Sequence, residues 1–179
     1  ANLAIYSLHL PLDGHPMYGH NVLIAKALDM SIESPFTSYK GRPYGCVCEG
    51  IGIEELSRRL KALFPRSYRA FCYGSEQPKR IAIMSGSGGQ ECLDEMVASD
   101  IDTLVTGEIH YSAISFAQLY KLNLFACGHY ATECFGIKAL LQLLHEKTQL
   151  PCDFIEDFCE LSTSKCSDVM EDRNILRYC

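Results

Sequence analysis

Apolar residues recur along the chain at two different spacings, and the two spacings alternate. Runs that are apolar throughout or at every second position are typical of β-strands, whereas apolar positions three and four residues apart are typical of helices. The strand-like runs cover residues 3–10, 44–48, 68–73, 80–84, 103–106, 122–127 and 152–155. The helical pattern begins near residue 21 and returns at about 53–63, 90–99, 111–120 and 133–147. This alternation predicts an α/β protein, with a loop over residues 31–43, which are rich in Ser, Pro, Gly and Thr.

Three strand–loop–helix units follow one another in the second half of the chain. Such units favour parallel strands joined by right-handed crossovers. Ligands of open parallel sheets bind at the carboxyl ends of the strands. Those ends fall at residues 85–89, 107–110 and 128–133, and we expect the functional residues there.

The charge balance removes two classes of partner. The net charge is −6, and a protein that binds a phosphate backbone needs a basic face, so nucleic acid is not an expected partner. No apolar run approaches the roughly 18 residues of a membrane span. We therefore expect no membrane partner either.

Cysteine is frequent but scattered. The chain has ten cysteines and no Cys-x-x-Cys pair. Cys72, Cys92 and Cys127 lie among apolar neighbours, where a free cysteine behaves as a small hydrophobic residue. Unpaired thiols are typical of a reducing compartment, which predicts a cytoplasmic location.

His9 and Asp13 are the first residues along the chain that suit metal binding. His9 stands near the end of a predicted strand, and Asp13 follows a turn that Pro11 stiffens. A strand end followed by a rigid turn can aim both side chains into one cleft. The alternative is a histidine and an aspartate with structural roles, because the spacing His-x-x-x-Asp often arises by accident.

His129 and Glu133 form a second pair. His129 stands at the carboxyl end of a predicted strand, and Glu133 begins a predicted helix for which Thr132 is the expected N-cap. Imidazole and carboxylate ligands suit zinc, iron and manganese ions, and a bridging carboxylate lets two ions activate a water molecule. Four ligands are too few for two ions, so a dinuclear site needs further ligands.

Other polar residues allow two interpretations. Glu108 and His110 could support the ligands or transfer protons in the same cleft, although a carboxylate at a helix start is equally expected for Glu108. Residues 85–89 could hold a phosphate on backbone N–H groups, but they lack the spacing of a P-loop, which favours a tight turn without a ligand. His20 is expected in an exposed loop, and His145 on the surface.

Four motifs occur in order along the chain. They are the stretch from Tyr6 to Pro16 with His9 and Asp13, Ser-Gly-Ser-Gly-Gly at 85–89, Asp-Thr-Leu-Val-Thr-Gly-Glu at 102–108 and Ala-Cys-Gly-His-Tyr-Ala-Thr-Glu at 126–133. Through these motifs, over about residues 3–155, the chain resembles the Nif3-like dinuclear metal-centre family. Bacterial members of that family are described as GTP cyclohydrolase 1 type 2 homologues.

The resemblance implies a mixed, two-lobed α/β fold and a site for two divalent metal ions. Zinc, iron or manganese would bind His9, Asp13, His129 and Glu133. The resemblance also implies a toroidal homohexamer whose sites face the interior. The activity that it implies is that of a metal-dependent hydrolase with a nucleotide substrate, as in GTP cyclohydrolase. Some members are described only as metal-binding or regulatory proteins, so a non-catalytic metal-binding ring protein is the alternative.

The chain departs from the family at its beginning. Family members carry a further segment there, whose His-His pair completes the metal site, and this sequence contains no His-His pair. Three explanations of this difference stay open: the chain is part of a longer protein, a separate chain supplies the segment, or the site is degenerate. On this resemblance the N-terminal part of the fold is missing.

The predicted divisions are a remnant of the N-terminal metal-binding lobe at 1–43, a small inserted lobe at 44–78, a C-terminal metal-binding lobe at 79–155 and a tail of unknown role at 156–179.

Overall fold

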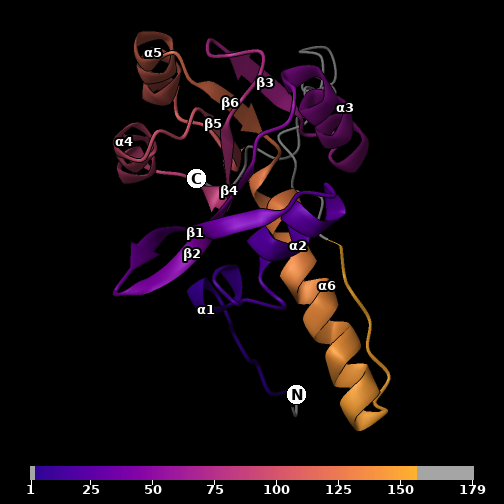
Figure 1. Ribbon diagram of the computed structural model, residues 1–179. Coiled ribbons are helices and arrows are strands. Elements are labelled where there is room, and N and C mark those ends of the chain that lie inside the picture. Colours follow the sequence, from indigo (N-terminus) through magenta and orange to yellow (C-terminus); the bar gives the residue numbers. More distant parts are fainter. Residues whose placement is uncertain (1–2, 157–179) are drawn as a thin grey trace, which may run out of the picture.

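A six-stranded sheet with helices packed on both faces makes up the part of the protein that the structure describes (Figure 1). The computed structural model describes residues 3–156. The strands are β1 (Ile32–Tyr39), β2 (Arg42–Glu49), β3 (Arg69–Cys72), β4 (Arg80–Ser87), β5 (Thr103–Glu108) and β6 (Asn123–Ala126). The helices are α1 (Leu10–Asp13), α2 (His20–Ala27), α3 (Ile53–Leu63), α4 (Gln90–Ala98), α5 (Tyr111–Tyr120) and α6 (His129–Thr148). The mixed α/β class predicted from the sequence is confirmed.

The sheet has the order β1-β2-β4-β5-β6-β3 and contains both parallel and antiparallel pairs. β4, β5 and β6 run parallel, in a register that places Val105 between Ile83 and Phe125. The β1–β2 hairpin on one side and β3 on the other flank this parallel centre in antiparallel pairing. The carboxyl ends of the three central strands therefore lie at one end of the sheet, as the strand–loop–helix units predict.

Two apolar layers cover the central strands, because successive side chains of a strand point to opposite faces. Ile81 and Ile83 belong to the layer that also contains Leu56 of α3 and contacts Phe135 of α6. Met84 belongs to the layer beneath α4 and α5. Burial on both faces explains why β4 is apolar without interruption from Ile81 to Met84, without the alternation of a half-exposed strand.

The prediction of a loop over residues 31–43 is wrong. β1 and β2 form a hairpin there, with Tyr39 paired to Arg42. Lys40 and Gly41 connect the strands with φ angles of 52° and 76°, which are typical of a two-residue turn whose twist matches that of the strands. β1 mixes the strand formers Ile32, Phe36 and Tyr39 with Ser, Pro and Glu, so its pairing with β2 decides its conformation.

Two predicted strands at the ends of the described part are also wrong. Residues 3–9 and 151–156 have no helical or strand assignment, and residues 10–13 form the short helix α1. Ile5 is 87% exposed. Apolar alternation indicates a strand only where a partner strand accepts its backbone hydrogen bonds, and no partner strand pairs with either segment within residues 3–156.

α6 is the longest helix of the described residues and extends well beyond the sheet (Figure 1). It begins at His129, four residues before the predicted start, with Gly128 at its N-cap. Thr132 and Gly136, both near its N-terminal end, are its only fully buried residues. No helix in the described part of the chain has the length and apolar character that a membrane span requires.

The predicted lobes share one sheet. β1 comes from residues 1–43, β2 crosses the boundary between 43 and 44, β3 comes from residues 44–78, and the three parallel strands come from residues 79–155. The division into lobes stays a prediction. Most of the predicted tail, residues 157–179, lies outside the described residues.

The cysteines of the described part are unpaired. Cys92 and Cys127 are buried in apolar surroundings, as expected, and burial raises the pKa of each thiol to about 12. Cys72 is exposed, so its predicted apolar environment is wrong. Cys159 and the two cysteines that follow it lie outside the described residues.

Asn21 joins three elements of the fold through one buried side chain. Its Oδ1 accepts a hydrogen bond from the backbone N–H of Ser85 at 2.6 Å, and its Nδ2 donates to the carbonyl oxygens of Asp13, at 3.3 Å, and of Tyr44. The side chain connects α2 with the end of α1, with β2 and with β4.

Replacing Asn21 with alanine should lower the free energy of unfolding by about 1–3 kcal/mol, because buried backbone groups of β2 and β4 lose their partner. Urea unfolding measures this change. Lys26→Ala, at an exposed position of the same helix, is the control and should change the unfolding free energy by less than about 0.5 kcal/mol. Equal values for the two variants would show that this connection contributes nothing to stability.

Candidate functional site

A cavity of about 310 Å³ lies beside the carboxyl end of β4. The side chains around it come from the start of the described chain, from the β1–β2 hairpin, from β4 and from the first turns of α6. They are His9, Leu10, Asp13, Tyr39, Tyr44, Ser85, Ser87, His129 and Glu133. The structure therefore brings all four predicted ligands to one cavity.

His129 and Glu133 occupy the first two turns of α6, four residues apart and on the same face. The ring Nε2 of His129 lies 3.2 Å from Oε1 of Glu133. The other ring nitrogen, Nδ1, lies 3.2 Å from Oε1 of Glu108, the last residue of β5. Of the two interpretations of Glu108, the structure supports the one that places it beside the cleft.

Asp13 is the buried carboxylate of the cavity. Only 7% of the residue is exposed, and the hydroxyl of Ser85 donates a hydrogen bond to its Oδ1 at 3.2 Å. Burial raises the pKa of this carboxyl above its ordinary value, and the negative charge of Glu133 raises it further. A buried carboxyl beside a second negative charge forms an environment that favours a cation.

His20 lies behind Asp13, and the prediction that it is exposed is wrong. It is the first residue of α2 and is buried, with Nε2 3.9 Å from Oδ1 of Asp13. Burial lowers the pKa of His20 to about 4, with a smaller contribution from the charge of His9. The ring is therefore neutral at pH 7, and its Nδ1 accepts a hydrogen bond from the backbone N–H of Gly136 at 2.9 Å. The contact with Asp13 is consequently not an ion pair at neutral pH.

Two glycines allow α6 to approach the strand ends. Gly86 has a φ of +66°, and a Cβ there would lie 2.4 Å from Oε1 of Glu133. A Cβ on Gly107 would lie 2.3 Å from the carbonyl oxygen of Gly86 and 2.8 Å from Cα of His129. A side chain at Gly107 would collide with the backbone of β4 and of α6, whereas one at Gly86 would displace the carboxylate of Glu133 and strain the positive φ.

Thr132, in the first turn of α6, connects this helix to β4 through a hydrogen bond. Its hydroxyl accepts a hydrogen bond from the N–H of Gly86 at 3.0 Å, and it lies 2.9 Å from the carbonyl oxygens of Gly128 and His129. The prediction that Thr132 caps the helix is wrong because α6 begins earlier. Its hydroxyl joins helix and strand.

The glycine-rich stretch after Met84 is part of the scaffold. β4 continues to Ser87, and side chains accept hydrogen bonds from three backbone N–H groups of this stretch. Those of residues 85, 86 and 88 donate to Asn21, Thr132 and Thr106, respectively. Groups with protein partners are not available to a phosphate, which agrees with the interpretation without a ligand.

The sequence did not indicate the aromatic side of the cavity. Tyr39 and Tyr44 reach it from the two strands of the hairpin, and only the pairing of those strands reveals their position. His110 lies next to the cavity, with Nε2 3.4 Å from the hydroxyl of Ser87. His145 is exposed near the end of α6, as expected.

The donor types suit zinc, iron or manganese, which accept imidazole and carboxylate ligands. Within residues 3–156, however, no three His, Cys, Asp or Glu side chains are grouped closely enough to hold a metal ion. Among the four predicted ligands, His129 and Glu133 are in direct contact. The cavity therefore combines side chains of the types that bind metal ions, in an arrangement that is not grouped as a metal site within the described residues.

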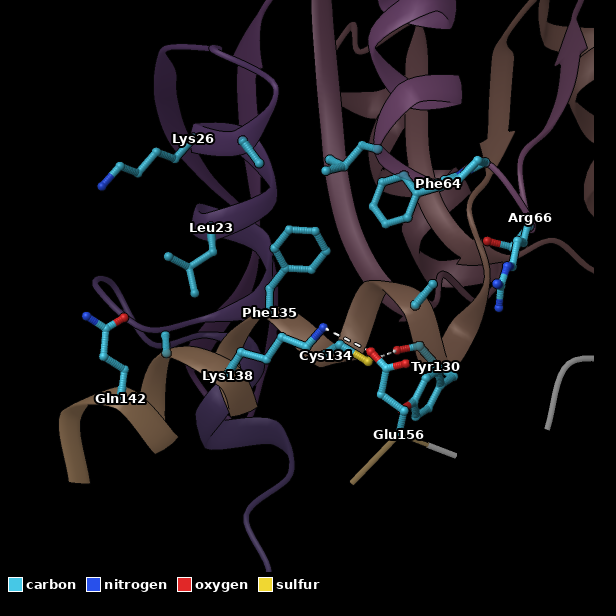
Figure 2. A pocket seen from close by; sticks show the side chains of 16 residues that line it. Leu23, Lys26, Phe64, Arg66, Tyr130, Cys134, Phe135, Lys138, Gln142 and Glu156 are labelled. Carbon is cyan, nitrogen blue, oxygen red and sulfur yellow. Dashed lines mark hydrogen bonds and ion pairs between the residues drawn. The ribbon is translucent and has the colours of Figure 1, made fainter. Parts of the chain in front are cut away.

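A larger cavity of about 820 Å³ lies between α2, the end of α3 and α6 (Figure 2). Figure 2 shows Leu23, Phe64 and Phe135 around it, with Lys138 3.7 Å from Glu156 at one side. None of the predicted ligands lines this cavity. The smaller cavity is thus the one that combines imidazole and carboxylate groups.

A mixed α/β sheet with two histidines and two carboxylates in one cavity beside its strand ends defines a class. It is the class of α/β proteins with a candidate metal site at the strand ends. Within that class the chain belongs to the Duf34/NIF3 (NGG1p interacting factor 3) family, whose sequence profile matches residues 1–163. The Nif3-like resemblance seen in the four motifs is confirmed.

Curated relatives support the same assignment. The chain is 35% identical over 164 residues to a GTP cyclohydrolase 1 type 2 homolog from Pyrococcus horikoshii, covering 88% of this chain and 64% of the relative. It is 36% identical over 158 residues to a protein of the same name from Yersinia pestis, covering 87% and 62%. The chain thus spans less than two thirds of the length of these relatives.

Two solved structures share the fold. The protein ybgI, described as of unknown function, superposes with a TM-score of 0.75 at 32% identity, covering 85% of this chain and 61% of that one. The protein TTHA1606 from Thermus thermophilus gives a TM-score of 0.69 at 28% identity, covering 85% and 60%.

Gly107→Ala should lower the free energy of unfolding by about 1–3 kcal/mol, because the new methyl group overlaps the backbone of β4 and α6. Gly88→Ala is the matched control in the same region. A Cβ there would meet the ends of the Cys92, Leu104 and Met84 side chains at 3.3–3.5 Å, and flexible side chains can yield. Urea unfolding of both variants compares the two sites, and a Gly107→Ala protein as stable as the control would contradict the close approach of α6.

Proposed function

We propose that the chain is part of a dinuclear divalent-metal-binding protein, and that the complete protein is a metal-dependent hydrolase of the GTP cyclohydrolase 1 type 2 homologue kind. One observation carries this proposal. His9, Asp13, His129 and Glu133, which lie up to 124 positions apart in the sequence, line the same small cavity at the carboxyl end of a central strand.

The roles of the side chains follow from their places around the cavity. His9, Asp13, His129 and Glu133 would hold the ions, with Asp13 or Glu133 as the bridging carboxylate. Bound divalent ions supply Lewis acidity and lower the pKa of a water molecule. His110, which contacts Ser87 at the cavity wall, and Glu108, which contacts His129, are the side chains placed to accept or deliver a proton.

The substrate, assembly and location belong to the same proposal. The names of the Pyrococcus horikoshii and Yersinia pestis relatives refer to GTP cyclohydrolase 1, and we take a purine nucleotide, GTP, as the substrate. A homohexamer is the assembly that we propose for the complete protein. The unpaired cysteines of the described residues support a reducing, cytoplasmic location.

The 179-residue chain should bind zinc or manganese, with fewer than two tightly held ions per chain, because four ligands do not complete two coordination shells. Equilibrium dialysis followed by elemental analysis measures the stoichiometry and the affinity. His129→Ala and Glu133→Gln should each weaken binding at least about tenfold, whereas His145→Ala, an exposed histidine on the same helix, should leave it unchanged. Metal binding that survives both site substitutions would contradict the proposed ligands.

The catalytic part of the proposal needs the complete protein. Ring opening of GTP should be detectable with the full-length Pyrococcus horikoshii relative loaded with metal, and it should be lost when the residues aligned with His129 and Glu133 are replaced. Chromatographic detection of the product tests this. A metal-loaded relative that leaves GTP intact would reject the hydrolase and favour the non-catalytic metal-binding alternative.

A further inference from the structure

The imidazole of His129 lies between two carboxylates that belong to different elements. Nε2 faces Glu133 on α6, and Nδ1 faces Glu108 on β5, with 3.2 Å between nitrogen and oxygen in both contacts. Glu133 lines the cavity, whereas Glu108 does not. The two carboxylates are thus inequivalent: one shares the cavity with the ring, and the other lies behind the ring.

A neutral imidazole has one N–H donor and one nitrogen lone pair. If the proton resides on Nδ1, the N–H lies beside the Glu108 carboxylate, and Nε2 keeps its lone pair for the cavity. If the proton resides on Nε2, the N–H lies beside Glu133, and His129 offers no lone pair at the cavity. The choice between the two tautomers therefore decides whether His129 can bind a metal ion from this side.

Glu108 is held in place by the sheet. It ends β5, where it pairs with Ser87 of β4, and it follows Gly107, whose lack of a side chain lets the backbone of His129 approach the strand. The backbones of Glu108 and His129 are thus held by two regular elements, and their side chains, each about half exposed, lie in contact. A carboxylate beside the second ring nitrogen of a histidine orients the ring and selects its tautomer.

We propose that Glu108 is a positioning residue for His129, which holds the Nδ1–H tautomer and keeps Nε2 available at the cavity. The expected effect of Glu108 on metal binding by His129 rests on the proposed function. The tautomer itself does not, because it is a property of the protein without metal.

The first experiment measures the tautomer of His129 in the metal-free chain, by long-range nitrogen–proton NMR at a pH at which the ring is neutral. The wild type should show the Nδ1–H form. In Glu108→Ala the population should shift toward Nε2–H, and in Glu108→Gln it should stay near the wild type, because the amide oxygen still offers an acceptor beside Nδ1. Glu91→Ala, an exposed carboxylate on α4, is the control. An Nε2–H ring in the wild type, or a ratio that does not change in Glu108→Ala, overturns the proposal.

The second experiment measures zinc affinity by competition with a chromophoric chelator. Glu108→Ala should weaken binding roughly 10- to 100-fold, with partial rescue in Glu108→Gln and no change in Glu91→Ala. Wild-type affinity in Glu108→Ala overturns the proposal. If even the wild type binds no zinc while the tautomer shifts as expected, the proposed metal function fails and the positioning by Glu108 stands.

Discussion

The approach of α6 to the ends of β4 and β5 is the contact on which the candidate site depends. Gly86 and Gly107 remove the side chains that would separate the helix from the strands, and the hydroxyl of Thr132 bonds to the N–H of Gly86. A helix fastened at its first turn has a defined rotation about its own axis. That rotation directs the face with His129 and Glu133 into the cavity, because residues four apart share a helix face.

The same arrangement brings carboxylates from three different elements to the cavity or next to it. Glu133 comes from the helix, Glu108 from the end of β5 and Asp13 from the short helix α1, and the histidines 9 and 129 lie among them. Asp13 is also held by Ser85, whose own N–H is bonded to the buried Asn21. Burial is the largest cause that raises the pKa of Asp13, and electrostatic repulsion by Glu133 is the next, against smaller opposing effects of His9 and His129. A divalent cation would relieve this repulsion, which is why the metal hypothesis agrees with the electrostatics as well as with the ligand types.

The sequence revealed the parts of the fold and site that depend on short spacings. The apolar β4, β5 and β6 indicate buried parallel strands, and His129 and Glu133 lie at the junction of strand and helix where ligands of such sheets are expected. Features that depend on distant pairing were not visible. Tyr39 reaches the cavity because β1 pairs with β2, and His20 is buried because α6 covers the start of α2. Residues 3–10 have the alternation of a strand without a partner strand to pair with in the described chain.

We propose that a metal ion binds in the cavity that His9, Asp13, His129 and Glu133 line. Diffraction at the zinc absorption edge, from crystals of the chain grown with zinc, tests it most directly. We predict an anomalous peak in the cavity, about 2.0–2.2 Å from Nε2 of His129 and from a carboxylate oxygen of Glu133 or Asp13. Anomalous peaks confined to other positions, such as surface cysteines or His145, with none in the cavity, would contradict it.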